Sequence, residues 1–369
     1  MRVLTILALV AGAAGCGKAA GLDDTEILQP YASLSGGVVF ATRAIQASNG
    51  YDLYVTPIPA AGDIGSQPAF RLTEAQGNEW QPSVSPGGNG IAFARSDDGI
   101  FLINRNGRVR QISDTDGTRF VDSLPAVSFD GQLVAWVRED LNQAIGDTGF
   151  SQAYIMVANA DGSDPRILIE KEGFVQDAPR FEPMDRSYRL VWSEFDARTL
   201  SGSGPTSYGI WLHDPITKMG SYVCQAPGVA VGQTVYRCFG QHIAWPIPGT
   251  VILPQNGLEF SLTGGPPDNV QARLVESIST QQVGFPVVEQ VGGFHRTFPV
   301  SAGYFRNEVM VIDGLITDVN GDLPTLGFFM ASVDGATVQR LFVAGLSNDY
   351  DPNNTAGYLF SVATPQIIP

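Results

Sequence analysis

A short phrase returns along this chain with changed wording, and its spacing constrains the fold more than any other feature. It reads QPSVSPGGNGIAFARS at 81–96 and LPAVSFDGQLVAWVRE at 124–139. Looser copies occupy 29–43, 178–194 and 351–365. The prolines that mark it lie 52, 43 and 54 residues apart, at Pro30, Pro82, Pro125 and Pro179. Self-similarity at such a period is typical of an architecture that stacks one small structural unit many times.

One complete unit, 80–113, predicts a four-stranded antiparallel meander. Its apolar runs GIAFAR and IFLINR are separated by turn sequences, and the third turn is Asn-Gly, a strong hairpin signal. Strands such as IAFA and VAWV are apolar without alternation, which indicates sheets that are packed on both faces. Such sheets, repeated, predict an all-β fold: a β-propeller with four-stranded antiparallel blades. We expect six blades, with seven as the alternative.

The remaining units are less regular. HIAWPI, LEFSL and ARLVE indicate a fifth unit, and FPVVEQ at 285–290, EVMVIDG, LGFFMASVDG and QRLFVAG a sixth. The stretch 235–300 is hard to divide into strands. We expect the terminal phrase 351–365 to close the ring by pairing with the N-terminal blade, because a closed ring leaves few exposed strand edges.

The N-terminal residues are typical of an export signal, and we do not expect them to be part of the folded domain. Residues 1–15 hold one basic residue, an apolar run and then small residues. The AAGC sequence that ends at Cys16 is similar to a bacterial lipobox, which implies a lipidated cysteine. Ordinary cleavage with an incidental cysteine is the alternative. Gly17 then favours the outer membrane, with the protein facing the periplasm or the cell surface. The predicted division is leader 1–15, tether 16–28 and propeller 29–369.

Two further cysteines, Cys224 and Cys238, are expected to form a disulfide in an exported protein. The alternative is a pair of reduced, buried thiols. The net charge is −15, which disfavours binding to the phosphate backbones of nucleic acids. A basic partner, or solubility alone, fits this charge better.

The phrases PSVSPGGNGIAF, PAVSFDGQLVAW and IMVANADGSDPRILI resemble the repeat of TolB-type, WD-like propellers of bacterial envelopes. The resemblance covers about two thirds of the chain at the level of single blades, and it concerns the propeller part alone. It implies a propeller scaffold that docks a protein or peptide. The partners of TolB itself do not transfer with it.

The sequence offers little support for catalysis. No Gly-x-Ser-x-Gly motif occurs, and His213, His242 and His295 lie in different units without motif spacing. We predict no catalytic residue, no metal ligand and no cofactor. Calcium at 114–117 or at 318–322 stays open, although neither segment completes a calcium loop.

Acidic residues recur near the start of successive units. Trp80, in a predicted loop beside the first of them, is a candidate for an exposed aromatic anchor. If these acids are equivalent, they form an arc around one mouth of the channel, as a site for a cation or a basic segment of a partner. The alternative is that each acid caps a nearby backbone N–H. The predicted partner-binding residues are Glu79, Trp80, Asp122, Asp177, Asp349 and Asp351.

Three functions remain open. The first is a non-enzymatic lipoprotein scaffold of the cell envelope, a monomer that binds a protein or peptide. The second is an enzyme or a binder of a small sugar or peptide that uses channel carboxylates. The third is a purely structural surface lipoprotein. Fold alone does not separate them, because propellers host many functions.

Overall fold

The computed structural model describes residues 36–42, 51–60, 67–73, 77–115, 117–201, 204–215, 218–231, 233–238, 243–253, 258–262, 270–274, 298–318, 324–332, 338–343 and 363–368. Several predictions fall outside this range. They concern the leader 1–15, the tether 16–28, Cys16, Asp349, Asp351, His242 and His295.

The described strands form six four-stranded antiparallel sheets and one two-stranded sheet. The first sheet contains β26 (Ala363–Ile367), β1 (Gly37–Thr42), β2 (Asp52–Pro57) and β3 (Phe70–Arg71) in that order. The second contains β4 (Glu79–Val84), β5 (Gly90–Arg95), β6 (Gly99–Asn104) and β7 (Val109–Gln111). The third contains β8 (Phe120–Val127), β9 (Leu133–Ala144), β10 (Ser151–Asn159) and β11 (Arg166–Glu170).

The other sheets follow in chain order. The fourth contains β12 (Phe174–Phe181), β13 (Leu190–Asp196), β14 (Tyr208–Asp214) and β15 (Met219–Gln225). A two-stranded sheet contains β16 (Val229–Val231) and β17 (Thr234–Tyr236). The fifth four-stranded sheet contains β18 (Ala244–Ile247), β19 (Thr250–Leu253), β20 (Leu258–Leu262) and β21 (Val270–Leu274). The sixth contains β22 (Phe298–Phe305), β23 (Glu308–Asp318), β24 (Pro324–Ser332) and β25 (Val338–Phe342).

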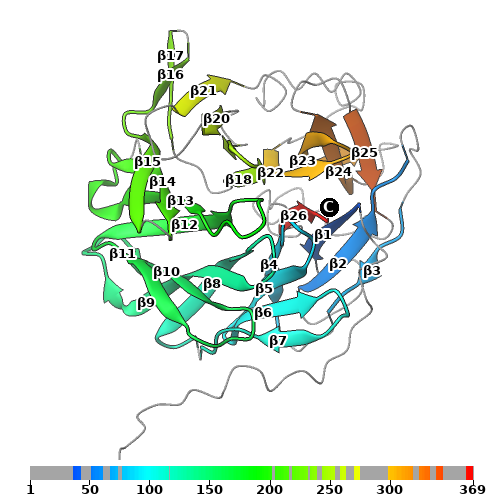
Figure 1. Cartoon of the computed structure of the whole chain (residues 1–369), viewed down its shortest axis with the longest axis horizontal. Coiled ribbons are helices and arrows are strands. Elements are labelled where there is room, and N and C mark those ends of the chain that lie inside the picture. The colour runs from blue at the N-terminus through cyan, green and yellow to red at the C-terminus, as the bar shows by residue number, and fades with distance from the viewer. Residues whose placement is uncertain are drawn as a thin grey trace, which may run out of the picture.

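The sheets stand around a central axis as a β-propeller (Figure 1). The first strand of each sheet lies nearest the axis, and these inner strands contact one another in the cyclic order β26, β4, β8, β12, β18 and β22. The C-terminal strand β26 pairs antiparallel with β1, which joins the two ends of the chain in one sheet. The prediction that 351–365 closes the ring is therefore confirmed for 363–365, and the strand continues to Ile367, whereas 351–362 lie outside the described residues.

Apolar side chains fill the space between neighbouring sheets rather than one central core. In one cluster Ala92 and Leu102 of the second sheet pack with Trp136 of the third, and in another Ala135 of the third packs with Trp192 of the fourth. This explains the runs without alternation, since every residue of β1 is buried. The predicted all-β propeller of small antiparallel sheets is confirmed.

The two least regular units differ from their predicted division. The fifth sheet has an additional strand, β19, which the sequence interpretation did not separate from its neighbours. The first strand of the sixth sheet is β22, and it begins at Phe298. The prediction that FPVVEQ at 285–290 is this first strand was wrong. Both segments contain the residues Phe-Pro-Val, so the pattern alone did not distinguish them.

Among the described residues, the helical structure is one 3₁₀ turn, η2 (Ala197–Thr199). The Asp196 side chain caps this turn by accepting a hydrogen bond from the Arg198 N–H at 3.0 Å. In the described ranges no helix has the length and hydrophobicity that crossing a membrane would need.

Candidate functional site at the upper face

The inner strands β4, β8 and β12 begin at the same face of the ring, and we call this the upper face. Antiparallel pairing brings the ends of the second strands β5, β9 and β13 to the same face. The predicted acids of the described chain lie at this end of the inner strands, within the strands rather than before them. The upper face is therefore the place to test the predicted arc of carboxylates.

Two of the predicted acids are buried and ion-paired inside their own sheets. Glu79 Oε1 accepts hydrogen bonds from Arg95 Nε and Nη2 at 3.1 and 2.7 Å. The two carboxylate oxygens of Asp122 accept from Arg138 Nε and Nη2, both at 2.7 Å. Both acid side chains are 0% exposed, whereas the arginine side chains are 10% and 19% exposed. The structure thus places these carboxylates beneath guanidinium groups, and an arginine on the second strand, not a backbone N–H, binds each of them.

Burial also affects the protonation of Glu79. Burial raises its pKa, while hydrogen bonds from Thr73 and Arg95 and the charge of Arg95 act in the opposite direction. The guanidinium therefore offsets only part of the cost of burying this carboxylate.

A β-bulge recurs in each of these inner strands at the anchor proline. The register shifts between Trp80 and Ser83 in β4 and between Ser123 and Ala126 in β8. The residue before the proline has a positive φ in both, 52° at Gln81 and 51° at Leu124. The Leu124 N–H donates to Gln81 Oε1 at 2.8 Å, which links the bulges of two neighbouring sheets. A bulge changes the direction in which the neighbouring side chains point. In β4 and β8 it lies between the partly exposed first half of the strand and the buried second half.

The register of the fourth sheet assigns a different residue to the position of the acids. Glu79 and Asp122 lie five residues before the last paired residue of their strands, and their partners are Arg95 and Arg138. Counting in the same way along β12 from Phe181 gives Gln176, whose partner across the pair is Glu194. Asp177 is opposite Ser193 instead, so the predicted equivalence of Asp177 with the other two acids was wrong.

Asp177 has a different neighbour, Arg180, on the same inner strand. Burial lowers the pKa of Arg180 to about 10, and the charge of Asp177 opposes this shift. Arg180 therefore remains protonated at neutral pH. Its Nη1 donates to the carbonyl of Pro179 at 2.7 Å. Asp177 therefore interacts electrostatically with Arg180, a residue of its own strand.

In the fourth sheet a lysine from a loop takes the place of the arginine. Lys171, just after β11, donates from Nζ to Glu194 Oε1 and to Tyr222 Oη, the latter at 3.0 Å. The same ammonium lies 3.5 Å from the centre of the Phe174 ring. Burial acts to lower the pKa of Lys171, but the bonds to Glu194 and Tyr222 outweigh it and the pKa is raised.

Gln176 is the exception in this network. Its side chain is buried, and neither the amide oxygen nor the amide nitrogen has a hydrogen-bond partner. The Glu194 carboxylate opposite it is bound instead by Lys171, by Tyr222 at 2.9 Å and by Trp192 Nε1 at 3.3 Å. Buried polar groups almost always find partners in folded proteins. Glu79 Oε2 also has none, but Gln176 has two unbonded polar atoms.

Trp80 is exposed, as the sequence predicts, although it lies in β4 rather than in a loop. Its side chain is 38% exposed and its ring centre lies 6.4 Å from that of Tyr51. Two other tryptophans, Trp136 and Trp192, are fully buried between sheets. Trp80 and Tyr51 therefore form an aromatic pair at the upper face, beside the position of Glu79.

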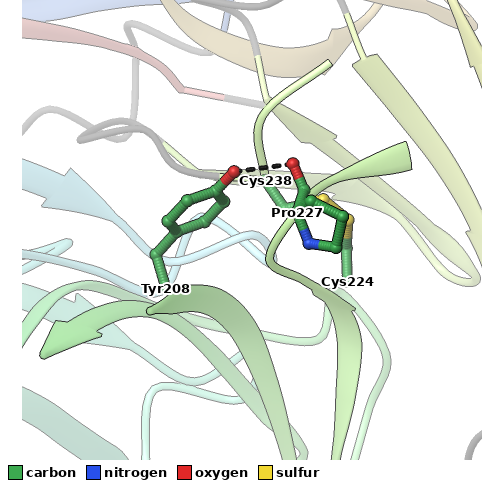
Figure 2. Close-up of a disulfide and its surroundings, with 4 residues drawn as sticks. All are labelled: Tyr208, Cys224, Pro227 and Cys238. Carbon is green, nitrogen blue, oxygen red and sulfur yellow. Dashed lines mark hydrogen bonds between the residues drawn. A yellow bond between two sulfur atoms is a disulfide. The ribbon is translucent and has the colours of Figure 1, made fainter. Parts of the chain in front are cut away.

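The predicted disulfide is present. Cys224, near the end of β15, is bonded to Cys238, with 5.7 Å between the two Cα atoms (Figure 2). Beside it the Tyr208 hydroxyl donates to the carbonyl of Pro227 at 2.7 Å. The bridge encloses the hairpin of β16 and β17, which projects from the ring (Figure 1). Such a bond indicates an oxidising compartment and an exported protein, and a loop of this size contributes about 3 kcal/mol to stability in the chain-entropy model.

The described residues offer no assembled metal centre. No group of three or more His, Cys, Asp or Glu side chains is placed to hold a metal ion in those ranges. The two calcium segments, 114–117 and 318–322, are only partly described. His213, at the end of β14 as expected, is half-buried, and burial lowers its pKa. Its ring lies 6.5 Å from that of Trp192, among packed side chains.

Sequence reasoning missed two residues of this region, Gln176 and Glu139. Gln176 lies three residues before Pro179, as Glu79 and Asp122 lie three before their prolines, so counting from the proline would have found it. Glu139 had no such signal. It lies on β9 and is half-buried, and its side chain has no hydrogen bond or ion pair to the described residues. Burial raises its pKa.

A scan against known protein-family models finds no match, and a search of curated protein sequences finds none either. Solved structures do resemble the chain. A chain in a nidogen/laminin complex has a TM-score of 0.51 at 9% identity, over 90% of this chain and 99% of that one. This likeness shows the fold alone.

TolB proteins are also among the similar structures, in agreement with the resemblance of the sequence. TolB from Acinetobacter baumannii has a TM-score of 0.48 at 13% identity, over 91% of this chain and 67% of that one. The structure of putative TolB from Agrobacterium tumefaciens has 0.41 at 12% identity, over 83% and 87%.

Proposed function

We propose that this chain is a non-enzymatic scaffold of the cell envelope that binds a protein or peptide at the upper face of its propeller. We count each four-stranded sheet as one blade, which gives six. The observation on which the proposal rests is Trp80, a large aromatic side chain that is exposed and paired with Tyr51 where the inner strands begin. Tryptophan and tyrosine are enriched among the residues that dominate binding energy in interfaces.

The ion pairs at the upper face change which side chains we expect a partner to contact. Glu79 and Asp122 are already neutralised by arginines, so they position the rim rather than contact a partner. Arg119 is more accessible, with 56% of its side chain exposed, and its guanidinium lies 4.5 Å from the centre of the Phe120 ring. A partner would therefore meet aromatic rings and guanidinium edges in this part of the face.

Photo-crosslinking in the cells that produce the protein tests this function, with Trp80→Ala as the variant and Phe70→Ala as the control. Phe70 is also an exposed aromatic residue, 46% exposed, but it lies on the outer strand β3. We expect one reproducible crosslinked protein with the wild type and Phe70→Ala, and at least a tenfold weaker crosslink with Trp80→Ala. Equal crosslinking in all three proteins contradicts docking at Trp80, and no specific crosslink favours a purely structural role.

The location of the protein needs a separate test. The disulfide and the leader-like residues 1–15 support export, and Cys16 supports a lipid anchor in the outer membrane. Stable anchoring needs two or more acyl chains, because each buried methylene contributes only about 0.8 kcal/mol. We expect a labelled fatty acid to be incorporated into the wild type and not into Cys16→Ser. A wild type that stays unlabelled rules out the lipid anchor.

A further inference from the structure

Two polar side chains without partners belong to opposite walls of one interface, between the third and fourth sheets. Gln176 is 1% exposed, with both amide atoms unbonded. Glu139 is half-buried, and its side chain has no hydrogen bond or ion pair with the described residues. Leaving a buried amide unpaired is costly, so a group that bonds to it removes that cost on binding.

The strand registers show that both side chains face this interface. Glu139 lies two residues after Val137 and pairs across β9 and β10 with Ala153, and both of those residues pack in the cluster that includes Trp192. Side chains two residues apart lie on the same face of a sheet, so Glu139 faces the fourth sheet. By the same rule Gln176, opposite Glu194, lies on the face of Trp192 and faces the third sheet.

The two side chains are also at matching heights in the propeller. Glu139 pairs with Val121, which is next to Asp122, and Asp122 is the register equivalent of Gln176. The strands β9 and β12 that hold them are in contact. Solvent reaches Glu139, since its side chain is only half-buried. The Gln176 amide is covered, so a ligand from the upper face meets Glu139 first and reaches Gln176 only if the side chains above it move aside.

The charges around this position favour a single cation. Glu139 and Glu194 are negative and Lys171 is positive, and the bond between Lys171 and Glu194 leaves the charge of Glu139 uncompensated. A carboxylate and an amide oxygen are both acceptors, and an ammonium group has three donors and no acceptor. The same interface already binds one ammonium, that of Lys171, through a carboxylate, a phenol and the Phe174 ring.

We propose that Glu139 and Gln176 form a binding site for a primary ammonium group, such as a lysine side chain of the partner, between the third and fourth sheets. This inference rests on the proposed function, because it names the group with which the partner would be anchored. The ammonium would donate to the Glu139 carboxylate and to Gln176 Oε1. The net charge of −15 favours a partner segment of this sign.

The test is an NMR titration of the ¹⁵N-labelled protein with Nα-acetyl-lysine methylamide at constant ionic strength. The side-chain NH₂ signal of Gln176, identified by its loss in Gln176→Leu, is the readout. We expect a saturable shift with a Kd of about 1 mM, which corresponds to about −4 kcal/mol. The Nε-acetylated probe has no ammonium and should give no saturable shift.

Matched variants make the result specific. Glu139→Gln keeps the shape of the side chain and should weaken binding of the probe about tenfold, while Asp147→Asn should leave binding unchanged. Asp147 is a good control because it is an exposed acid in the loop that follows β9. No saturable shift in the wild type overturns the proposal, and so does equal binding in Glu139→Gln and the wild type.

Failure of this inference can be told apart from failure of the proposed function. If the crosslinked partner is lost in Trp80→Ala but retained in Glu139→Gln, docking stands and the ammonium site does not. If the probe binds through Glu139 but no protein is crosslinked in a Trp80-dependent way, the site stands without the scaffold function.

Discussion

Two regions of the upper face use the same strand position in opposite ways. In the second and third sheets the inner strand supplies a carboxylate, Glu79 or Asp122, and the second strand supplies the arginine that binds it. In the fourth sheet the inner strand has Gln176, the second strand has the carboxylate Glu194, and the cation Lys171 comes from a loop.

The comparison separates the structural role of a repeat position from a functional one. Where acid and arginine are paired within a sheet, each carboxylate has a cation beside it, although Glu79 Oε2 has no hydrogen-bond partner. Where the pair is reversed, the cation comes from elsewhere and one buried amide is left unbonded. Departures from local consistency are expected at functional sites, so the fourth sheet is a candidate for a second contact beside the docking surface at Trp80.

Arg138→Met should have the largest effect on stability. It leaves the Asp122 carboxylate buried without its cation, which costs about 3–5 kcal/mol. Urea unfolding monitored by tryptophan fluorescence measures this loss. The double variant Asp122→Leu with Arg138→Met should recover most of it, because no unpaired charge remains. A loss below about 1 kcal/mol in the single variant would mean that the pair is not buried as described.

Lys171→Met should cost less, about 1–3 kcal/mol, because Glu194 keeps its bonds from Tyr222 and Trp192. The Lys171 side chain is also 36% exposed, so solvent screens its charge more than that of Arg138. The same urea experiment compares the two variants. A greater loss for Lys171→Met than for Arg138→Met would reverse the ranking of the two regions.

Gln176→Leu should change stability in the opposite direction, with a gain of about 1–2 kcal/mol, since it removes a buried amide that has no partner. At the equivalent position Asp122→Leu should destabilise the protein, because it leaves Arg138 without its carboxylate. Thermal unfolding of both variants gives the two signs. A destabilised Gln176→Leu would show that the amide is bonded in solution.

Glu139→Gln should have the smallest effect, a rise in Tm of about 1–3 °C at pH 8. Burial raises the pKa of Glu139, so the folded state holds its proton more tightly than the unfolded state. The wild type therefore loses stability as pH rises through the raised pKa, and it recovers that stability below the ordinary pKa of a glutamate. The advantage of the neutral variant should disappear in acid. An advantage that is independent of pH would point to packing rather than charge.

Much of the fold could be predicted from the sequence because its signals are local. The hairpin turns, the continuous apolar strands and the repeat spacing each depend on residues close together in the chain. They predicted β5 with its exact bounds and β6 to within one residue, whereas β9 extends five residues beyond the predicted phrase. The sixth sheet failed at its first strand, because two segments share the letters Phe-Pro-Val and only pairing with β23 selects Phe298. The disulfide followed from the count of cysteines and the export signal.

The candidate site was only half predictable. Glu79 and Asp122 were found from their recurrence, and Trp80 was found because it stands beside Glu79; its exposure was expected. That Arg95 and Arg138 bind the two acids was not predicted, since each pair joins residues 16 apart across a bulged strand pair. Glu139 could not be predicted, because no sequence motif indicates that a side chain will lack a hydrogen-bond or ion-pair partner in the folded protein.

The amino-acid sequence alone determined the propeller fold. A small sheet with two apolar faces can bury both of them only when it packs between two neighbouring sheets. The tertiary structure decided which groups meet at the upper face. Bulges at the anchor prolines fix the register, and one step of register moves a side chain to the other face of its sheet. That step is why Gln176, and not Asp177, occupies the place of the acids.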